Sequence, residues 1–129
     1  RDNIHRIDPD ITIEIHDIRL NPQAITDIYA DCDIIIEAFD NADMKEMLVE
    51  TALKAWGDNT LSIGSGMAGW GRSELIRERR LGNNLIVCGD EQSEVSEENP
   101  PLAPRVGIVS NMQANAAVDI LMDRISEKE

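Results

Sequence analysis

The chain has 129 residues, and 42% of them are hydrophobic, which is enough for one globular domain with a buried core. Only 3% are aromatic, so we expect that core to be aliphatic. The 25 acidic and 12 basic residues give a net charge of −13, which disfavours binding to nucleic acid. No segment is long and apolar enough to span a bilayer, so we expect no membrane partner.

The first fifteen residues carry two short patterns. Ile4 and Ile7 share one face of a helix, and Pro9 ends the pattern, so residues 1–8 are expected to be the tail of a helix that starts before the chain does. Isoleucine then occupies every second position of residues 11–15. That alternation predicts a strand near a sheet edge, with one dry and one wet face.

The next two elements have clear local signals. Asn21 as N-cap and Pro22 in the first turn favour a short helix that runs to about Ala30. A strand is expected at residues 33–39, because Ile34–Ile36 are apolar on both sides. Such a run is typical of a strand buried between helices in a parallel sheet.

A periodic helix is expected over residues 42–56, with Asn41 as its N-cap and Gly57 as its stop. Its apolar stripe consists of Met44, Met47, Leu48, Thr51, Ala52 and Ala55. A short strand at residues 60–63 follows. Strands and helices that alternate with short connections predict parallel pairing and right-handed crossovers.

The pattern then changes. Residues 73–80 and 84–88 flank Leu81-Gly82-Asn83, which predicts an antiparallel hairpin. Residues 90–98 hold five acidic side chains and no basic one, so we expect a solvated loop. A long helix is predicted over residues 105–126. Its inner stripe is Val109, Met112, Gln113, Ala116, Ile120 and Leu121. The whole is a single α/β domain, 1–129, with a Rossmann-like parallel sheet, helices on its faces and a hairpin extension.

Asp40 is the first candidate for a functional residue. Ligands of open α/β sheets bind outside the carboxyl ends of the strands, and Asp40 follows such an end. A carboxylate there can hold magnesium and position nucleotide phosphates. The alternative is that Asp40 and Asn41 only cap the helix that follows. Gly64-Ser65-Gly66 follows the next strand, where small residues let a ligand approach the backbone, although an ordinary turn also explains them.

Other chemistry-bearing residues have simpler explanations. Arg77, Arg79 and Arg80 are expected to pair with Glu74, Glu78 or the acidic loop rather than with a ligand. His5 and His16 belong to no ligand-spaced cluster. Cys32 and Cys88 form no C-x-x-C motif, so no zinc site is indicated, and two reduced structural thiols are typical of a cytoplasmic protein. A reactive Cys88 is an open alternative, although nearby acids would raise its pKa.

Three segments resemble the ThiF/MoeB/HesA family, the bacterial relatives of ubiquitin-activating enzymes, and most closely its ThiF-type branch. They are Phe39-Asp40-Asn41, the Gly64-Ser65-Gly66 strand end, and Ala103-Pro104-Arg105-Val106-Gly107-Ile108 with the later Gln113-Ala114-Asn115. The resemblance implies a nucleotide-binding fold that adenylates the C-terminal glycine of a small ubiquitin-like sulfur-carrier protein, as in thiamine- or molybdopterin-type sulfur transfer. ATP and magnesium would be the cofactors.

The same resemblance implies roles for individual residues. Asp40 matches the family's aspartate of the magnesium–ATP site, and Asn41 and the Gly64–Gly66 strand end would line the nucleotide. Pro104, Arg105, Val106 and Gly107 would lie near the carrier's tail and the floor of the active site.

Other family features are not found in these 129 residues, namely the glycine-rich ATP loop, the ribose-binding acid and the phosphate-binding Arg and Lys. We therefore expect the C-terminal part of such an enzyme. Alone, it should bind ATP poorly, fail to adenylate, and self-associate as a homodimer through uncovered sheet edges. Two other readings stay open. One is a fragment of an NAD-dependent dehydrogenase, because the Ile-Glu-Ala run also resembles a strand of some hydroxyacyl dehydrogenases. The other is a non-catalytic module that binds the carrier protein.

Overall fold

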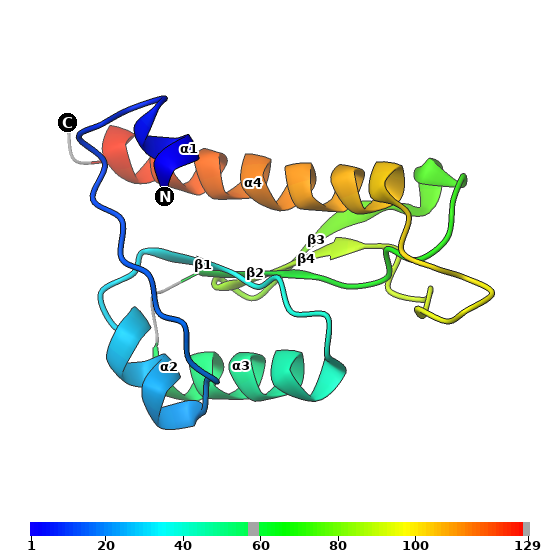
Figure 1. Ribbon diagram of the computed structural model, residues 1–129, viewed down its shortest axis with the longest axis horizontal. Helices are drawn as coiled ribbons and strands as arrows, with labels where there is room; N and C mark the ends of the chain where they lie inside the picture. The colour runs from blue at the N-terminus through cyan, green and yellow to red at the C-terminus, as the bar shows by residue number, and fades with distance from the viewer. Residues whose placement is uncertain (57–59, 128–129) are drawn as a thin grey trace.

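The structure is a computed structural model that describes residues 1–56 and 60–127, and its elements form three layers (Figure 1). The middle layer is a four-stranded sheet of order β1-β2-β4-β3. Helices α2 and α3 cover one face of the sheet, and α4 covers the other. The strands are β1 (Ile34–Ile36), β2 (Thr60–Gly64), β3 (Arg77–Leu81) and β4 (Leu85–Gly89). The helices are α1 (Asp2–His5), α2 (Pro22–Tyr29), α3 (Ala42–Ala55) and α4 (Ala103–Ser126), with a 3-10 turn η1 (Ser73–Leu75) before β3. The predicted fold class is confirmed.

The hairpin is more deeply integrated than an extension. Strand β1 pairs with β2 in parallel, and β2 pairs in parallel with β4, with Ser62 opposite Ile86. Only β3 runs antiparallel, along β4, with Glu78 opposite Cys88. The second strand of the hairpin is thus the third member of the parallel sheet. A continuous apolar run makes this possible, since Ile86, Val87 and Cys88 are all buried.

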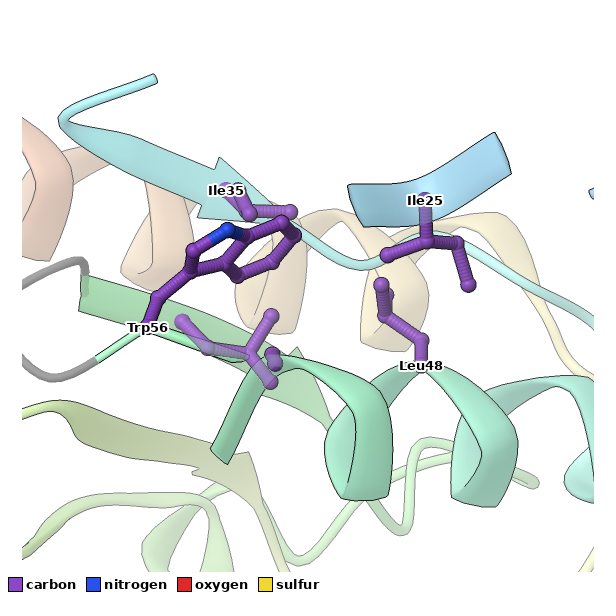
Figure 2. Close-up of a cluster of buried hydrophobic side chains, with 6 residues drawn as sticks. Ile25, Ile35, Leu48 and Trp56 are labelled. Atoms are coloured by element: carbon purple, nitrogen blue, oxygen red, sulfur yellow. The ribbon is translucent and has the colours of Figure 1, made fainter. Parts of the chain in front are cut away.

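Two hydrophobic clusters hold the layers together. The first joins α2, β1, β2 and α3, and Figure 2 shows four of its members, Ile25, Ile35, Leu48 and Trp56. The second joins α4 to β4 and contains Val109, Ala116, Ile76, Ile86 and Cys88. Aliphatic side chains dominate both clusters, as the composition predicts.

Both helix caps predicted from the sequence are confirmed. The backbone N–H of Ala24 donates to the Asn21 side-chain oxygen at 2.9 Å, at the start of α2. At the start of α3, the backbone N–H of Met44 donates to the side-chain oxygen of Asn41 at 3.1 Å. The predicted stop at Gly57 lies outside the described residues. No helix in the described part of the chain has the length and apolar character needed to cross a membrane.

Several predictions are wrong in part. Of the hairpin strand predicted at residues 73–80, Ser73–Leu75 form a 3-10 turn and the strand begins at Arg77, and Ala55 of the predicted stripe is exposed. Residues 11–15 are extended but form no strand, because no strand lies beside them within the described ranges. Strand β1 covers only 34–36 and is an edge strand, so Ile35 is buried whereas Ile36 is 48% exposed. Leu121 is 42% exposed, since the inner stripe of α4 continues through Ala117 and Ile120 instead.

Candidate functional site

One edge of the sheet gathers most of the candidate residues. The parallel strands β1, β2 and β4 all end there, and α3 and α4 begin there (Figure 1). Helix N-termini carry unpaired N–H groups and partial positive charge, which favours anionic ligands at this edge. The loop of residues 90–102 connects β4 to α4 at the same edge.

Asp40 lies in the exposed turn between β1 and α3. Its carboxylate makes no hydrogen bond or ion pair with any other described residue, whereas the cap of α3 is supplied by Asn41. A neighbouring cavity of about 380 Å³ is lined by Glu37, Ala38 and Phe39 but not by Asp40. The carboxylate is therefore free for a ligand at the surface of this edge, outside that cavity.

The carboxylates at this edge do not form a complete metal cage. Within residues 1–56 and 60–127, no three His, Cys, Asp or Glu side chains are grouped to hold a metal ion. Magnesium is commonly held by one or two carboxylates, the phosphates of a substrate and water. Asp40, which has no partner among the described residues, is compatible with that mode of binding.

Glu37 is buried at the end of β1, with only 2% of its surface exposed. One oxygen, Oε1, accepts a hydrogen bond from the backbone N–H of Phe39 at 2.5 Å. The other, Oε2, lies 3.3 Å from the ammonium of Lys45 and has no hydrogen bond of good geometry. A buried carboxylate thus sets the turn that leads to Asp40.

Lys45 and Gln113 connect this turn to the neighbouring elements. The Lys45 ammonium also donates to the carbonyl of Gly64, so it joins the ends of β1 and β2 from the first turns of α3. The buried Gln113 amide of α4 donates to the carbonyls of Glu37 at 3.1 Å and Ser62 at 3.2 Å. These contacts tie α3 and α4 to the carboxyl ends of β1 and β2.

The glycines of the 64–66 segment face protein at close range. Gly66 has a φ of 75°, and a Cβ there would collide with Asp90 and the backbone that follows it. Gly89 has a φ of 141°, and a Cβ there would collide with the carbonyl of Ser65. The ends of β2 and β4 therefore need glycine for their own close approach. The predicted nucleotide contacts of Gly64, Ser65 and Gly66 stay predictions.

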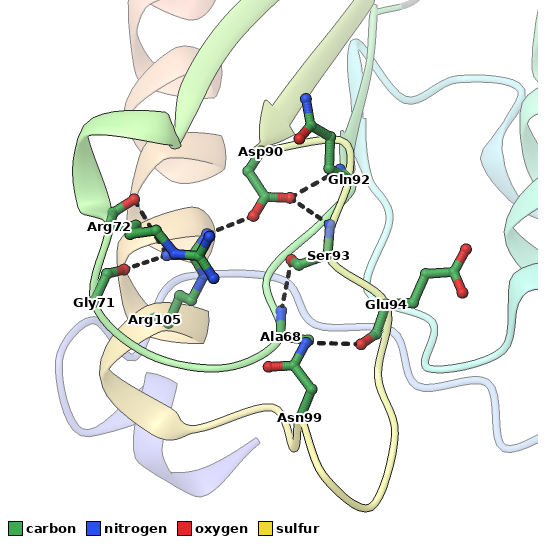
Figure 3. Close-up of polar contacts among 9 residues, drawn as sticks. All are labelled: Ala68, Gly71, Arg72, Asp90, Gln92, Ser93, Glu94, Asn99 and Arg105. Carbon is green, nitrogen blue, oxygen red and sulfur yellow. Dashed lines mark hydrogen bonds and ion pairs between the residues drawn. The ribbon is translucent and has the colours of Figure 1, made fainter.

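The Pro104–Gly107 segment begins α4, and its arginine is used within the chain. Arg105 is 4% exposed, and its guanidinium donates to Asp90 Oδ2 at 2.5 Å and to the carbonyls of Gly71 and Arg72 (Figure 3). This contact joins the start of α4 to the loop after β4 and to the segment after β2. The two terminal nitrogens of Arg105 are thus used within the fold, whereas its buried Nε has no hydrogen-bond partner in the described part of the chain.

Asp90 starts the acidic loop but is not solvated, contrary to the prediction for this position. Its side chain is 8% exposed, and its Oδ1 accepts from the N–H groups of Gln92 at 2.9 Å and Ser93 at 2.8 Å (Figure 3). Burial raises the pKa of Asp90, but the hydrogen bonds from Ser93, Gln92 and Arg105 outweigh it and lower the pKa to about 2. The carboxylate is ionised throughout the neutral range.

The other predicted alternatives resolve as ordinary structure. Arg79 pairs with Glu91 of the acidic loop and Arg80 pairs with Glu78, as expected. Arg80 also pairs with Asp119 of α4, which was not expected, and Arg77 forms no ion pair within the described residues. Burial raises the pKa of the Cys88 thiol, and the Glu78 carboxylate raises it further, while the nearby Ser62 side chain opposes both. A buried thiol with a raised pKa is a poor nucleophile.

Sequence reasoning missed the role of the polar residues beneath the site. Glu37 interrupts an otherwise apolar run at residues 34–39, and that interruption is a usable signal for a buried functional group. Lys45 looks like any polar residue on the outer face of a helix. The Asp90–Arg105 contact spans 15 residues between a loop and a helix, and no local pattern indicates it.

Comparison with known proteins agrees with this arrangement. The model of the ThiF family matches residues 1–129, the whole chain. No curated protein and no solved structure matched in the same comparisons. Because that match covers the whole chain, the chain belongs to the ThiF family.

Proposed function

We propose that this chain forms part of an ATP-dependent adenylyltransferase that activates the C-terminal glycine of a small ubiquitin-like sulfur-carrier protein. Family membership over the whole chain supports the adenylyltransferase class. The observation that carries the site is Asp40, an exposed and unpaired carboxylate at the carboxyl end of β1, where α/β folds bind nucleotides.

The proposed reaction is attack by the carrier's terminal carboxylate on the α-phosphate of ATP. A bond forms between a carboxylate oxygen and phosphorus, and the bond to the β-phosphate bridging oxygen breaks, which releases pyrophosphate. Catalysis of this kind depends on positioning and on neutralising developing charge. Asp40 would hold magnesium, which supplies that positive charge when bound. Asn41 fixes the turn through its cap on α3.

The substrate's tail would lie over the start of α4. Because Arg105 is buried and paired with Asp90, we assign tail binding to its neighbours in the segment. Pro104 is exposed, Val106 is partly exposed, and a Cβ at Gly107 would meet no neighbour within 4 Å. An extended tail that ends in glycine can pack closely on such a surface, since it has no side chain to accommodate.

The test uses the natural protein in which these residues occur. Carrier-dependent exchange of pyrophosphate into ATP reports formation of the adenylate. We expect Asp40→Asn to reduce that exchange at least about 100-fold, because one charge at the reacting phosphates is lost. Asp43→Asn, a neighbouring acid in the first turn of α3, is the matched control and should retain activity.

One result would contradict the proposal, and a second would contradict the expectation that this chain alone binds ATP weakly. Full exchange activity in Asp40→Asn would remove the aspartate from the site. Isothermal titration gives the second, because the 129-residue chain alone is expected to bind magnesium–ATP weakly, as it contains no glycine-rich phosphate loop. Micromolar binding to the chain alone would place the phosphate site within it.

A further inference from the structure

We propose that Glu37 is a positioning residue for Asp40, acting through the turn between them and through Lys45. This inference rests on the proposed function, because it assigns a task within the same site. Glu37 lies three residues before Asp40, and Asn41, which caps α3, lies directly after it. Asp40 is therefore carried on a short turn with one anchor at each end.

The anchor at Glu37 uses every polar group of the residue. Its N–H donates to the carbonyl of Ser62 at 2.8 Å, and its carbonyl accepts from Gln113 at 3.1 Å. Its Oε1 accepts from the N–H of Phe39, the residue immediately before Asp40. A hydrogen bond to an ionised acceptor is roughly twice as strong as a neutral one, so the charge of Glu37 matters for the turn.

Lys45 contacts the second carboxylate oxygen of Glu37 and links it to the end of β2. Its ammonium lies 3.3 Å from Glu37 Oε2 and donates to the carbonyl of Gly64, the last residue of β2. The side chain is 25% exposed, whereas that of Glu37 is 1% exposed. The pair thus reaches from the core to the surface at the edge where Asp40 lies.

Stability alone does not account for this pair. Replacing a buried ion pair by well-packed apolar residues is often neutral or stabilising, and here Oε2 lacks a good hydrogen bond. The surrounding residues, Ile35 and Phe39 among them, are apolar and would accept an apolar side chain. A charge retained in such surroundings is explained by the turn that it sets.

The first measurement needs no ligand. Glu37→Gln keeps the size of the side chain and removes its charge, so the Phe39 amide should lose protection. We expect its hydrogen exchange to rise at least about tenfold, with Val87 in β4 unchanged. Unchanged exchange at Phe39 would overturn the positioning role. The double variant Glu37→Gln with Lys45→Met removes both charges and should show the same local loss if the single variant folds poorly.

The second measurement follows magnesium in the exchange assay of the natural protein. Glu37→Gln should raise the magnesium concentration at half-maximal rate at least about fivefold, by the loss of preorganisation at the metal ligand. Asp90→Asn, which weakens the fold at a separate ion pair, should leave that concentration within about twofold. An equal shift in both variants would reduce Glu37 to a structural residue.

The two proposals fail differently. If Asp40→Asn is active, the proposed function is wrong, while the exchange of Phe39 still reports whether Glu37 fixes the turn. If Asp40→Asn is inactive but Glu37→Gln has normal amide exchange and a normal magnesium requirement, the proposed function stands and the positioning role is wrong.

Discussion

Two ion pairs lie at the same edge of the sheet, and they are built alike. In each, a carboxylate just after a parallel strand meets a cation in the first turns of the next long helix. Glu37 follows β1 and meets Lys45 of α3, and Asp90 follows β4 and meets Arg105 of α4. Each pair fastens a loop to a helix where the strands end.

The two pairs differ in how completely their carboxylates are hydrogen-bonded, although Arg105 Nε, like Glu37 Oε2, has no hydrogen-bond partner among the described residues. Asp90 accepts three hydrogen bonds, from two backbone N–H groups and Arg105, and both side chains are at most 8% exposed. Glu37 has one oxygen without a good hydrogen bond, and Lys45 reaches the surface. A closed pair serves the fold, whereas an open pair beside an unpaired aspartate fits a site that a ligand completes.

Removal of Arg105 should have the largest effect on stability. Arg105→Met leaves the Asp90 charge buried without its cation, which typically costs about 3–5 kcal/mol. Urea unfolding followed by circular dichroism measures the loss. Arg79→Met breaks the exposed pair with Glu91 and should change little. If Arg105→Met lowers the free energy of unfolding no more than Arg79→Met does, the Asp90–Arg105 pair does not stabilise the fold as proposed.

The pH dependence of stability should come next in size. Asp90 has a pKa of about 2 in the fold against an ordinary value of 3.8. A lowered pKa stabilises the fold above pH 3.8, and this contribution, about 2 kcal/mol, disappears as the pH falls through 2.

Unfolding midpoints in urea between pH 5 and pH 2 would show this loss. Asp90→Asn should lower stability at pH 5 and flatten the curve in the acid range. If the stability of Asp90→Asn still falls as steeply between pH 5 and pH 2, other carboxylates cause the loss of stability in acid.

The comparison also shows what a sequence can predict. The helices α2 and α3, their asparagine caps and the hairpin depend on neighbouring residues, and local patterns predicted them. Strand β1 was expected in the middle of the sheet, but its place depends on which strands lie beside it. The extended segment 11–15 became no strand for the same reason.

The candidate site also contains residues that the local sequence predicts and residues that it does not. Asp40 could be chosen from its position after an apolar run, and the structure leaves it exposed and unpaired at a strand end. The partners of Glu37 and Arg105 come from distant elements, with Gln113 76 residues from Glu37. Contacts at such separations follow from the fold as a whole and not from any local spacing.

The smallest effect should come from the cap beside the open pair. Asn41→Ala removes the hydrogen bond to the N–H of Met44 and should cost about 1 kcal/mol. Asn21→Ala removes the equivalent cap of α2 and should cost about the same, on a helix that contributes to neither ion pair. Only the first should loosen Lys45, because the lost cap lies in the same first turn of α3 as the bond from Lys45 N–H to the Asn41 carbonyl.

Hydrogen exchange separates these two caps where stability cannot. In Asn41→Ala, the amides of Phe39 and Lys45 should both exchange faster, because the turn and the first turns of α3 share the Glu37 anchor. In Asn21→Ala they should stay protected, with faster exchange confined to α2. Equal protection of the Phe39 amide in both variants would show that Glu37 alone holds the turn that carries Asp40. The Glu37–Lys45 pair would then not depend on the N-terminal cap of α3.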